Sequence, residues 1–260
     1  MTTNYMLTMS RDGITDYCYL RKFLNFVEAN DIHKWVIGRE TGKNGRKHWQ
    51  IRIATRWTFE QMQVMFPGAH IEECSDTWEY ETKEGQYLKW DDRPENLRER
   101  FGSFRFAQEY VRKALERSND REVVVWYDER GNCGKSWFTR ALWERGLAYY
   151  SAGTDKGTTI VQDIASEYLK HGWRPYVVID IPRAGKWSTE LYEAIERVKD
   201  GLIKDPRYSA NSINIHGVKV LVCCNTMPKL DKLSQDRWNI INQSEIEWVE
   251  KTMDLRGAFS

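Results

Sequence analysis

The stretch that decides the fold is Trp126–Ser136, with the sequence WYDERGNCGKS. It follows three consecutive valines, Val123–Val125, an apolar β-branched run that predicts a buried strand. It precedes WFTRAL, residues 137–142, whose pattern is that of the first turns of a helix. A strand, a glycine-bearing loop ending in Gly-Lys-Ser and a helix are the context that a phosphate-binding loop requires. The sequence therefore predicts a nucleoside triphosphate site near the middle of the chain.

Each part of this loop suits a part of the nucleotide. Backbone N–H groups at the start of a helix attract phosphate, and Lys135 adds a positive charge for the β- and γ-phosphates. Ser136 offers a hydroxyl group to Mg²⁺. The loop departs from the GxxxxGK[ST] pattern because Glu129 occupies its first glycine position. We expect the phosphate-binding backbone to comprise Gly131, Asn132, Cys133 and Gly134.

Composition describes an ordinary globular chain with room for two domains. It has 260 residues, 41% of them hydrophobic and 30% charged, and a net charge of +1, so any contact with nucleic acid must come from a local basic patch. Its five cysteines are odd in number and show no CxxC spacing, which favours reduced thiols inside a cell. There is no signal peptide and no apolar run of 18 residues, so we expect neither secretion nor a membrane span.

The N-terminal part reads as a small α+β domain, which we place at residues 1–92. Strands are expected at 4–10, 34–38, 48–54 and 69–72, and helices at 19–29, 59–65 and 77–89. Within the third strand polar and apolar residues alternate, so one sheet face is polar and the other is buried: His48, Gln50 and Arg52 against Trp49, Ile51 and Ile53.

The polar face carries a candidate metal site. His48 and Gln50 are two residues apart on a strand, so both side chains point the same way, and Glu40 at the end of the neighbouring strand can reach them. One imidazole, one amide oxygen and one carboxylate suit Mg²⁺ or Mn²⁺. Taken alone, two polar residues on a strand are more often structural. Basic residues cluster here and favour a phosphate backbone, although a solvated turn is the alternative: Arg39, Lys43, Arg46, Lys47, Arg52 and Arg56.

A candidate nucleophile follows in the sequence YETKEG, residues 80–85. On the helix expected at 77–89, Tyr80 and Lys83 lie on one face, so an ammonium group could sit near the phenol. A cation there favours the phenolate that attack on phosphorus needs. Tyr87, two helical turns further on, is a competitor for the same role.

Four motifs, taken in order, resemble those of the replication-initiator (Rep) proteins of circular single-stranded DNA viruses, such as circoviruses, nanoviruses and their alphasatellites. They are LTMS (7–10), HWQ (48–50), YETKEG (80–85) and the GKS loop. The resemblance implies an HUH-type endonuclease domain, with an antiparallel sheet and helices, followed by an α/β superfamily 3 helicase domain of AAA+-like fold. It places the metal ligands on Glu40, His48 and Gln50, the nucleophile on Tyr80 and the motif lysine on Lys83. LTMS lacks the usual asparagine, so no function is carried over to it.

The second half fits the ATPase of that resemblance. Pro94 marks a boundary, and we expect a helical linker or oligomerisation segment at 93–118 and the ATPase domain at 119–260. Tyr176–Asp180 is an apolar strand ending in an acid, the Walker B arrangement that holds Mg²⁺. Relatives often have a second acid next, but here Ile181 follows. The base that polarises water therefore stays open between Asp180 and Glu129.

Three further features complete the predicted ATPase. The basic segment Lys204–Asn214, with Lys204 and Arg207, falls where these helicases place a hairpin that contacts DNA. The strand 218–225 ends in Asn225, a candidate sensor of the γ-phosphate, although asparagine is also a common turn former. Arg237 is either an arginine finger reaching a neighbouring subunit or a member of a structural ion pair.

These features predict a rolling-circle replication initiator. It nicks and rejoins origin DNA through a 5′-phosphotyrosine with Mg²⁺ or Mn²⁺, and it unwinds DNA with ATP and Mg²⁺. The resemblance implies a single-stranded stem-loop substrate, a homo-oligomeric ring of six subunits, host replication partners and a location in the host nucleus. Two alternatives stay open. One is an ATP-dependent nucleic-acid-binding protein without nuclease activity, and the other is a plasmid or integrated cellular homologue.

Overall fold

The computed structural model describes residues 2–11, 16–42, 44–153, 156–204 and 212–257. The chain forms two compact units, Met1–Arg100 and Phe101–Ser260. This division splits the segment that we predicted as a linker. Helix α3 (Pro94–Phe101) begins within the first unit, whereas α4 (Phe106–Arg117) packs Val111 and Leu115 into a core of the second unit.

The first unit is built on one antiparallel sheet in the order β4-β1-β3-β2-β5. Its strands are β1 (Thr3–Ser10), β2 (Lys34–Thr41), β3 (Lys47–Thr55), β4 (His70–Glu73) and β5 (Tyr87–Lys89). Helices α1 (Asp16–Ala29) and α2 (Phe59–Met65) contribute Phe23, Val27 and Met62 to the core against the apolar side chains of β3. Trp49, Ile51 and Ile53 of β3 are buried as predicted, but Gln50 and Arg52 on the polar face are buried as well, at 3% and 4% exposure.

The helix predicted at 77–89 is wrong. Only Tyr80–Thr82 form a single 3₁₀ turn, η1, and the chain then returns to the sheet as β5, which pairs with β2. Gly85 has φ +66°, a left-handed conformation that is incompatible with continuing a helix. The Thr82 hydroxyl group donates to the Glu79 carbonyl and closes the turn locally.

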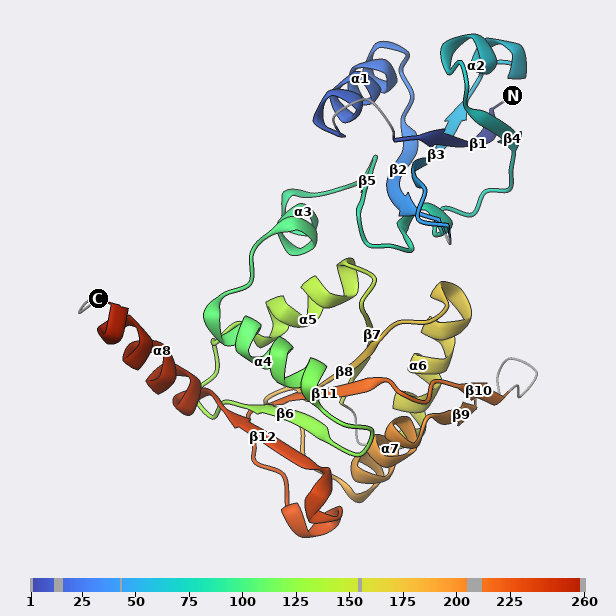
Figure 1. The fold of residues 1–260 in the computed structure, drawn as a ribbon. Coiled ribbons are helices and arrows are strands. Elements are labelled where there is room, and N and C mark those ends of the chain that lie inside the picture. The colour runs from blue at the N-terminus through green and yellow to red at the C-terminus, as the bar shows by residue number, and fades with distance from the viewer. Residues whose placement is uncertain (1, 12–15, 43, 154–155, 205–211, 258–260) are drawn as a thin grey trace. The chain divides into compact units, whose positions relative to one another are not determined.

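The second unit is built on a five-stranded parallel sheet in the order β12-β6-β11-β8-β7 (Figure 1). Its strands are β6 (Val123–Tyr127), β7 (Ala148–Ala152), β8 (Tyr176–Asp180), β11 (Lys219–Cys224) and β12 (Trp238–Asn242). Its other helices are α5 (Lys135–Glu144), α6 (Gly157–His171), α7 (Thr189–Asp200) and α8 (Gln243–Gly257), with short turns η2 (Leu230–Lys232) and η3 (Gln235–Arg237).

Both faces of this sheet are buried. Val123 and Val125 pack with α6 and α7 in one core, whereas Val124 and Trp126 pack with α4 and α5 in another. That explains why β6 reads as a continuous apolar run rather than an alternating one. A separate two-stranded sheet joins β9 (Leu202–Lys204) to β10 (Ser212–Asn214) in antiparallel register, so the predicted basic hairpin has its two strands. Within the described residues, no helix is long and apolar enough to cross a membrane.

Candidate active sites

The three predicted metal ligands lie together on the first sheet. Glu40 on β2 is paired in register with His48 on β3, and Gln50 follows two residues along β3. The Nε2 atom of His48 lies 3.3 Å from Oε2 of Glu40, and both side chains are largely buried. Thr8 on β1 donates its hydroxyl hydrogen to Oε1 of Gln50 at 3.0 Å, which orients the amide. The pairing of three adjacent strands therefore builds one cluster of nitrogen and oxygen ligands.

This cluster fits a divalent cation. The buried Oε2 atom of Glu40 has no hydrogen-bond partner, and Nδ1 of His48 faces the Arg46 carbonyl at 3.4 Å. A proton on Nδ1 leaves the Nε2 lone pair facing that carboxylate oxygen, an arrangement that a cation between them stabilises. Within the described part of the chain, this cluster included, no group of three or more His, Cys, Asp or Glu residues is placed to hold a metal, and Glu40 and His48 are the two residues of these types here. A cation here would therefore take Gln50 as its third ligand.

Lys83 joins this cluster to Tyr80. Its ammonium group forms an ion pair with Oε1 of Glu40 and lies 3.8 Å from the centre of the Tyr80 ring. Burial lowers the pKa of Lys83, but hydrogen bonds to Glu40 and Tyr80 outweigh it and leave the pKa above its usual value. Lys83 is therefore a cation at neutral pH. Tyr80 itself is half exposed, so its phenol is open to a substrate.

Residues of the sheet fix the turn that carries Tyr80. Gly38 on β2 lies so close to η1 that a Cβ atom on it would be 2.0 Å from the Glu81 carbonyl oxygen. Nε of Arg52 donates to Oε1 of Glu81 at 2.8 Å, and both side chains are buried. Arg52 also donates to the Ser75 carbonyl. The prediction that Arg52 belongs to a phosphate-binding cluster is therefore wrong, because its guanidinium group is used inside the protein.

Tyr87 does not share a helix face with Tyr80. It lies on β5 opposite Gly38, is 8% exposed, and has the guanidinium carbon of Arg100 3.6 Å from its ring centre. Tyr87 is part of the sheet because residues 87–89 form strand β5 and not the predicted helix.

Among the predicted DNA contacts in this unit, Arg46 and Lys47 are exposed beside His48, and Lys43 lies outside the described residues.

The loop after β6 has the backbone of an anion site. Gly131, Asn132 and Gly134 have φ values of +81°, +64° and +94°, and α5 begins directly at Lys135. Positive φ values turn successive N–H groups toward one concave side, which is how peptide backbones hold phosphate. These residues line a cavity of about 360 Å³ that also includes Ser136 and Asn225.

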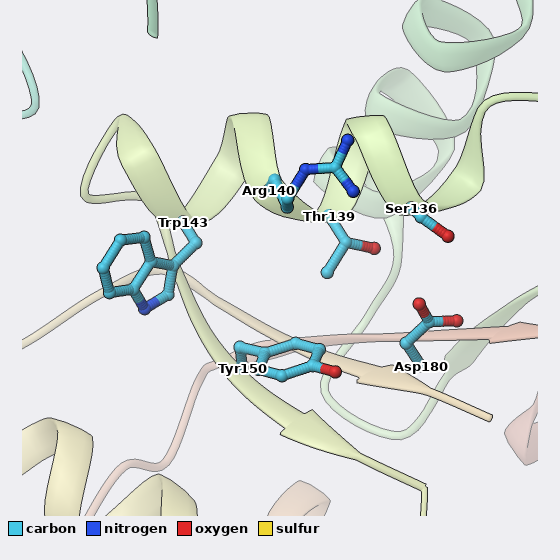
Figure 2. A pocket seen from close by; sticks show the side chains of 6 residues that line it. All are labelled: Ser136, Thr139, Arg140, Trp143, Tyr150 and Asp180. Atoms are coloured by element: carbon cyan, nitrogen blue, oxygen red, sulfur yellow. The ribbon is translucent and has the colours of Figure 1, made fainter. Parts of the chain in front are cut away.

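Strand pairing brings the remaining nucleotide residues to the same edge of the sheet. Asp180 ends β8 opposite Cys223 of β11, and Asn225 follows that strand directly. Ser136 and Asp180 line a second cavity, of about 300 Å³, where their oxygen atoms face the space between α5 and β8 (Figure 2). Burial raises the pKa of Asp180, and the charges of Lys135 and Arg140 only partly oppose that effect.

Asp128 is a site residue that the sequence reasoning missed. It follows β6 directly, is 3% exposed, and places Oδ2, which has no hydrogen-bond partner, 3.6 Å from Nζ of Lys135. The signal for it was an acid at the carboxyl end of a buried parallel strand, where ligand sites of such sheets gather. By contrast, Glu129 is exposed and contributes its backbone carbonyl, which accepts from Arg183 at 2.9 Å.

Arg237 lies in ion pairs within its own chain. It is 8% exposed, with Nε 3.5 Å from Glu196 and an Nη atom 3.2 Å from Asp200. It also precedes Trp238, which is in register with Val123 at the start of β6, whereas the phosphate-binding loop follows the end of β6. This geometry matches the structural alternative, and a finger role in a neighbouring subunit stays a prediction.

The predicted DNA contacts of the second unit are described in part. Lys204 is exposed at the end of β9, and Arg207 lies outside the described residues.

Comparison with known proteins finds that the chain is similar to viral replication proteins. It is 27% identical to Para-Rep C7 of the faba bean necrotic yellows C7 alphasatellite, over 76% of this chain and 86% of the relative. It is 26% identical to Para-Rep C10 of the milk vetch dwarf C10 alphasatellite, over 85% and 93%. It is 24% identical to the master replication protein of banana bunchy top virus, over 83% and 93%. No protein-family model matches the chain.

Proposed function

We propose that this chain, which belongs to the replication-initiator (Rep) proteins of nanovirus-type circular DNA viruses, starts rolling-circle replication by nicking DNA and then unwinds it with ATP. In this proposal Met1–Arg100 is an HUH-type endonuclease domain, and Phe101–Ser260 is a superfamily 3 helicase domain. The antiparallel sheet with its polar face supports the first assignment. The parallel sheet with a phosphate-binding loop after β6 supports the second.

One observation carries the nuclease proposal. Lys83 contacts both a carboxylate of the candidate metal cluster and the ring of the one tyrosine that its own turn exposes. A cation beside a phenol stabilises the phenolate, and this cation also pairs with a carboxylate of the candidate metal cluster, so it links the two groups that a reaction at phosphorus would use. It lowers the energy of the phenolate and of the additional negative charge in the transition state.

The reaction transfers a phosphodiester from a sugar to Tyr80. The Tyr80 oxygen bonds to phosphorus as the bond from phosphorus to the 3′ oxygen breaks, the phenolic proton passes to solvent, and the 3′ oxygen takes a proton from solvent and leaves as a hydroxyl group. Glu40, His48 and Gln50 would hold Mg²⁺ or Mn²⁺, which would polarise the scissile phosphate when bound. Because the phosphotyrosine bond keeps the energy of the bond that was broken, the same site can rejoin the strand.

The second unit binds ATP with Mg²⁺ in this proposal. The phosphates lie on the loop 131–134 and Lys135, and Ser136 and Asp180 hold Mg²⁺. Asn225 orients the attacking water or the γ-phosphate. The basic segment 204–214, with Lys204 and Arg207, contacts DNA in a ring of identical subunits, and the ring works on viral DNA in the host nucleus with host replication proteins. The basic turn at Lys43, Arg46 and Lys47 binds the stem-loop of the origin.

The test is a nicking assay on end-labelled stem-loop DNA with Mn²⁺. The wild-type chain should release a labelled fragment and form a covalent adduct that survives denaturing electrophoresis. Tyr80→Phe should abolish both, whereas Tyr17→Phe should leave both intact, because Tyr17 is 72% exposed on α1 and its substitution costs no packing. DNA binding without any adduct from the wild-type chain would instead favour an ATP-dependent nucleic-acid-binding protein.

A further inference from the structure

We propose that Arg183 contacts the terminal phosphate of the nucleotide bound in its own subunit and stabilises the charge that develops there during hydrolysis. The inference rests on the proposed ATPase function and names a catalytic residue for it. Arg183 follows the Walker B strand by three residues, in the sequence Asp-Ile-Pro-Arg.

The geometry puts its guanidinium group at the phosphate-binding loop. An Nη atom of Arg183 donates to the Glu129 carbonyl at 2.9 Å. The other Nη atom lies 3.5 Å from where a Cβ atom on Gly131 would be, and Nδ2 of Asn225 lies at the same distance from that point. The guanidinium group and the sensor amide therefore meet over one loop glycine, which lines the cavity of about 360 Å³.

The turn after β8 brings Arg183 to this position. The Ile181 N–H group donates to the Cys223 carbonyl at 2.9 Å, so the chain stays beside β11 for one residue more. The Gly185 N–H group then donates to the Pro182 carbonyl at 2.7 Å and closes a tight turn, in which a Cβ atom on Gly185 would be 2.9 Å from that carbonyl oxygen. Because β11 lies between β8 and β6, the long arginine side chain spans β11 to reach the loop that follows β6.

The charge of Arg183 is suited to a phosphate. Its partner in the loop is a neutral backbone carbonyl, and the side chain is exposed, so a phosphate oxygen can replace or join that contact at little cost. A guanidinium group offers five N–H donors in a fixed fork that matches phosphate. Arg237 differs in both respects, because it is buried and paired with the carboxylates of Glu196 and Asp200.

A binding experiment tests the contact without relying on turnover. Dissociation constants of a non-hydrolysable ATP analogue and of ADP are measured with Mg²⁺ by isothermal calorimetry. Arg183→Ala should weaken the ATP analogue about ten-fold and leave ADP within two-fold, since losing one charge-assisted hydrogen bond costs about this much. The matched control is Arg197→Ala, an exposed arginine of α7 that is paired with Glu193, which should change neither constant by more than two-fold. Equal weakening of both nucleotides by Arg183→Ala would overturn the assignment.

A mixing experiment tests whether Arg183 acts in its own subunit. Lys135→Ala and Arg183→Ala should each abolish ATP hydrolysis when the variant is assayed alone. If Arg183 serves its own site, a mixture of the two inactive variants stays inactive at every ratio. Recovery of ATP hydrolysis on mixing would show that Arg183 serves a neighbouring site, and would overturn the proposal. Failure of the wild-type chain to bind either nucleotide would overturn the ATPase function itself, which separates the two failures.

Discussion

Substituting Gly38 by alanine should slow nicking about 100-fold without preventing folding or DNA binding. The added Cβ atom would lie 2.0 Å from the Glu81 carbonyl oxygen and 3.2 Å from its carbon. Because the clashing atom is backbone and not the end of a flexible side chain, β2 and η1 must separate by about 1 Å, and a misplacement of that size costs about 100-fold in rate. The overpacking itself should cost about 1–3 kcal/mol of unfolding free energy.

The assay compares single-turnover cleavage of labelled stem-loop DNA, DNA affinity by fluorescence anisotropy, and urea unfolding for the same preparations. Gly68→Ala is the matched control, because Gly68 has φ +81° and open space around it. It should lose about 1 kcal/mol of stability through backbone strain and keep its cleavage rate. If Gly38→Ala cleaves at the wild-type rate, the close approach of η1 to β2 does not position Tyr80, and our reasoning about this turn is refuted.

Three other predictions concern the roles proposed for the two units. His48→Ala or Gln50→Ala should reduce nicking far more than DNA affinity, whereas neutralising Arg46 and Lys47 should weaken DNA binding and flatten its salt dependence. An equal loss of DNA affinity in the His48 or Gln50 variants and in the Arg46 and Lys47 variants would indicate that His48 and Gln50 contact DNA or are structural. Lys135→Ala should eliminate ATP hydrolysis and leave nicking of single-stranded origin DNA unchanged, and a matching loss of nicking would contradict the separation. Asp180→Asn should raise the free energy of unfolding at pH 7 in EDTA while abolishing ATP hydrolysis. Burial raises the pKa of Asp180, so the folded state binds its proton more tightly than the unfolded state and the ionised form costs stability at neutral pH. The gain should vanish as the pH falls below about 3.8, the ordinary value, and urea unfolding of both proteins across pH 3–8 checks it.

The spacing of apolar residues was sufficient to predict a strand or helix where the segment is regular and is buried on one face or on both. The alternation of β3 predicted its buried face, and the apolar run of β6 followed by the glycine loop predicted a strand, loop and helix, which the structure has. The ligand set of Glu40, His48 and Gln50 could be grouped because strand neighbours have a fixed geometry.

The same reasoning failed where tertiary contacts override local pattern. Residues 77–89 have a helical spacing, but Gly85 and the pairing of β5 with β2 convert them to a turn and a strand. Arg52 reads as a surface cation, and only the buried carboxylate of Glu81, 29 residues away, reveals its structural role. Arg237 could not be assigned from sequence because Glu196 and Asp200 reach it from another helix.

The central claim is that Tyr80 becomes covalently joined to DNA, and mass spectrometry of the adduct tests it most directly. Trypsin cleavage after Arg56 and Lys83 yields the peptide 57–83, in which Tyr80 is the only tyrosine, whereas Tyr87 falls in the peptide 84–89. After incubation with stem-loop DNA and Mn²⁺ and digestion with trypsin and nuclease, we expect a nucleotide phosphate on peptide 57–83 at Tyr80. The same mass on peptide 84–89, or on any peptide of the second unit, would contradict the account.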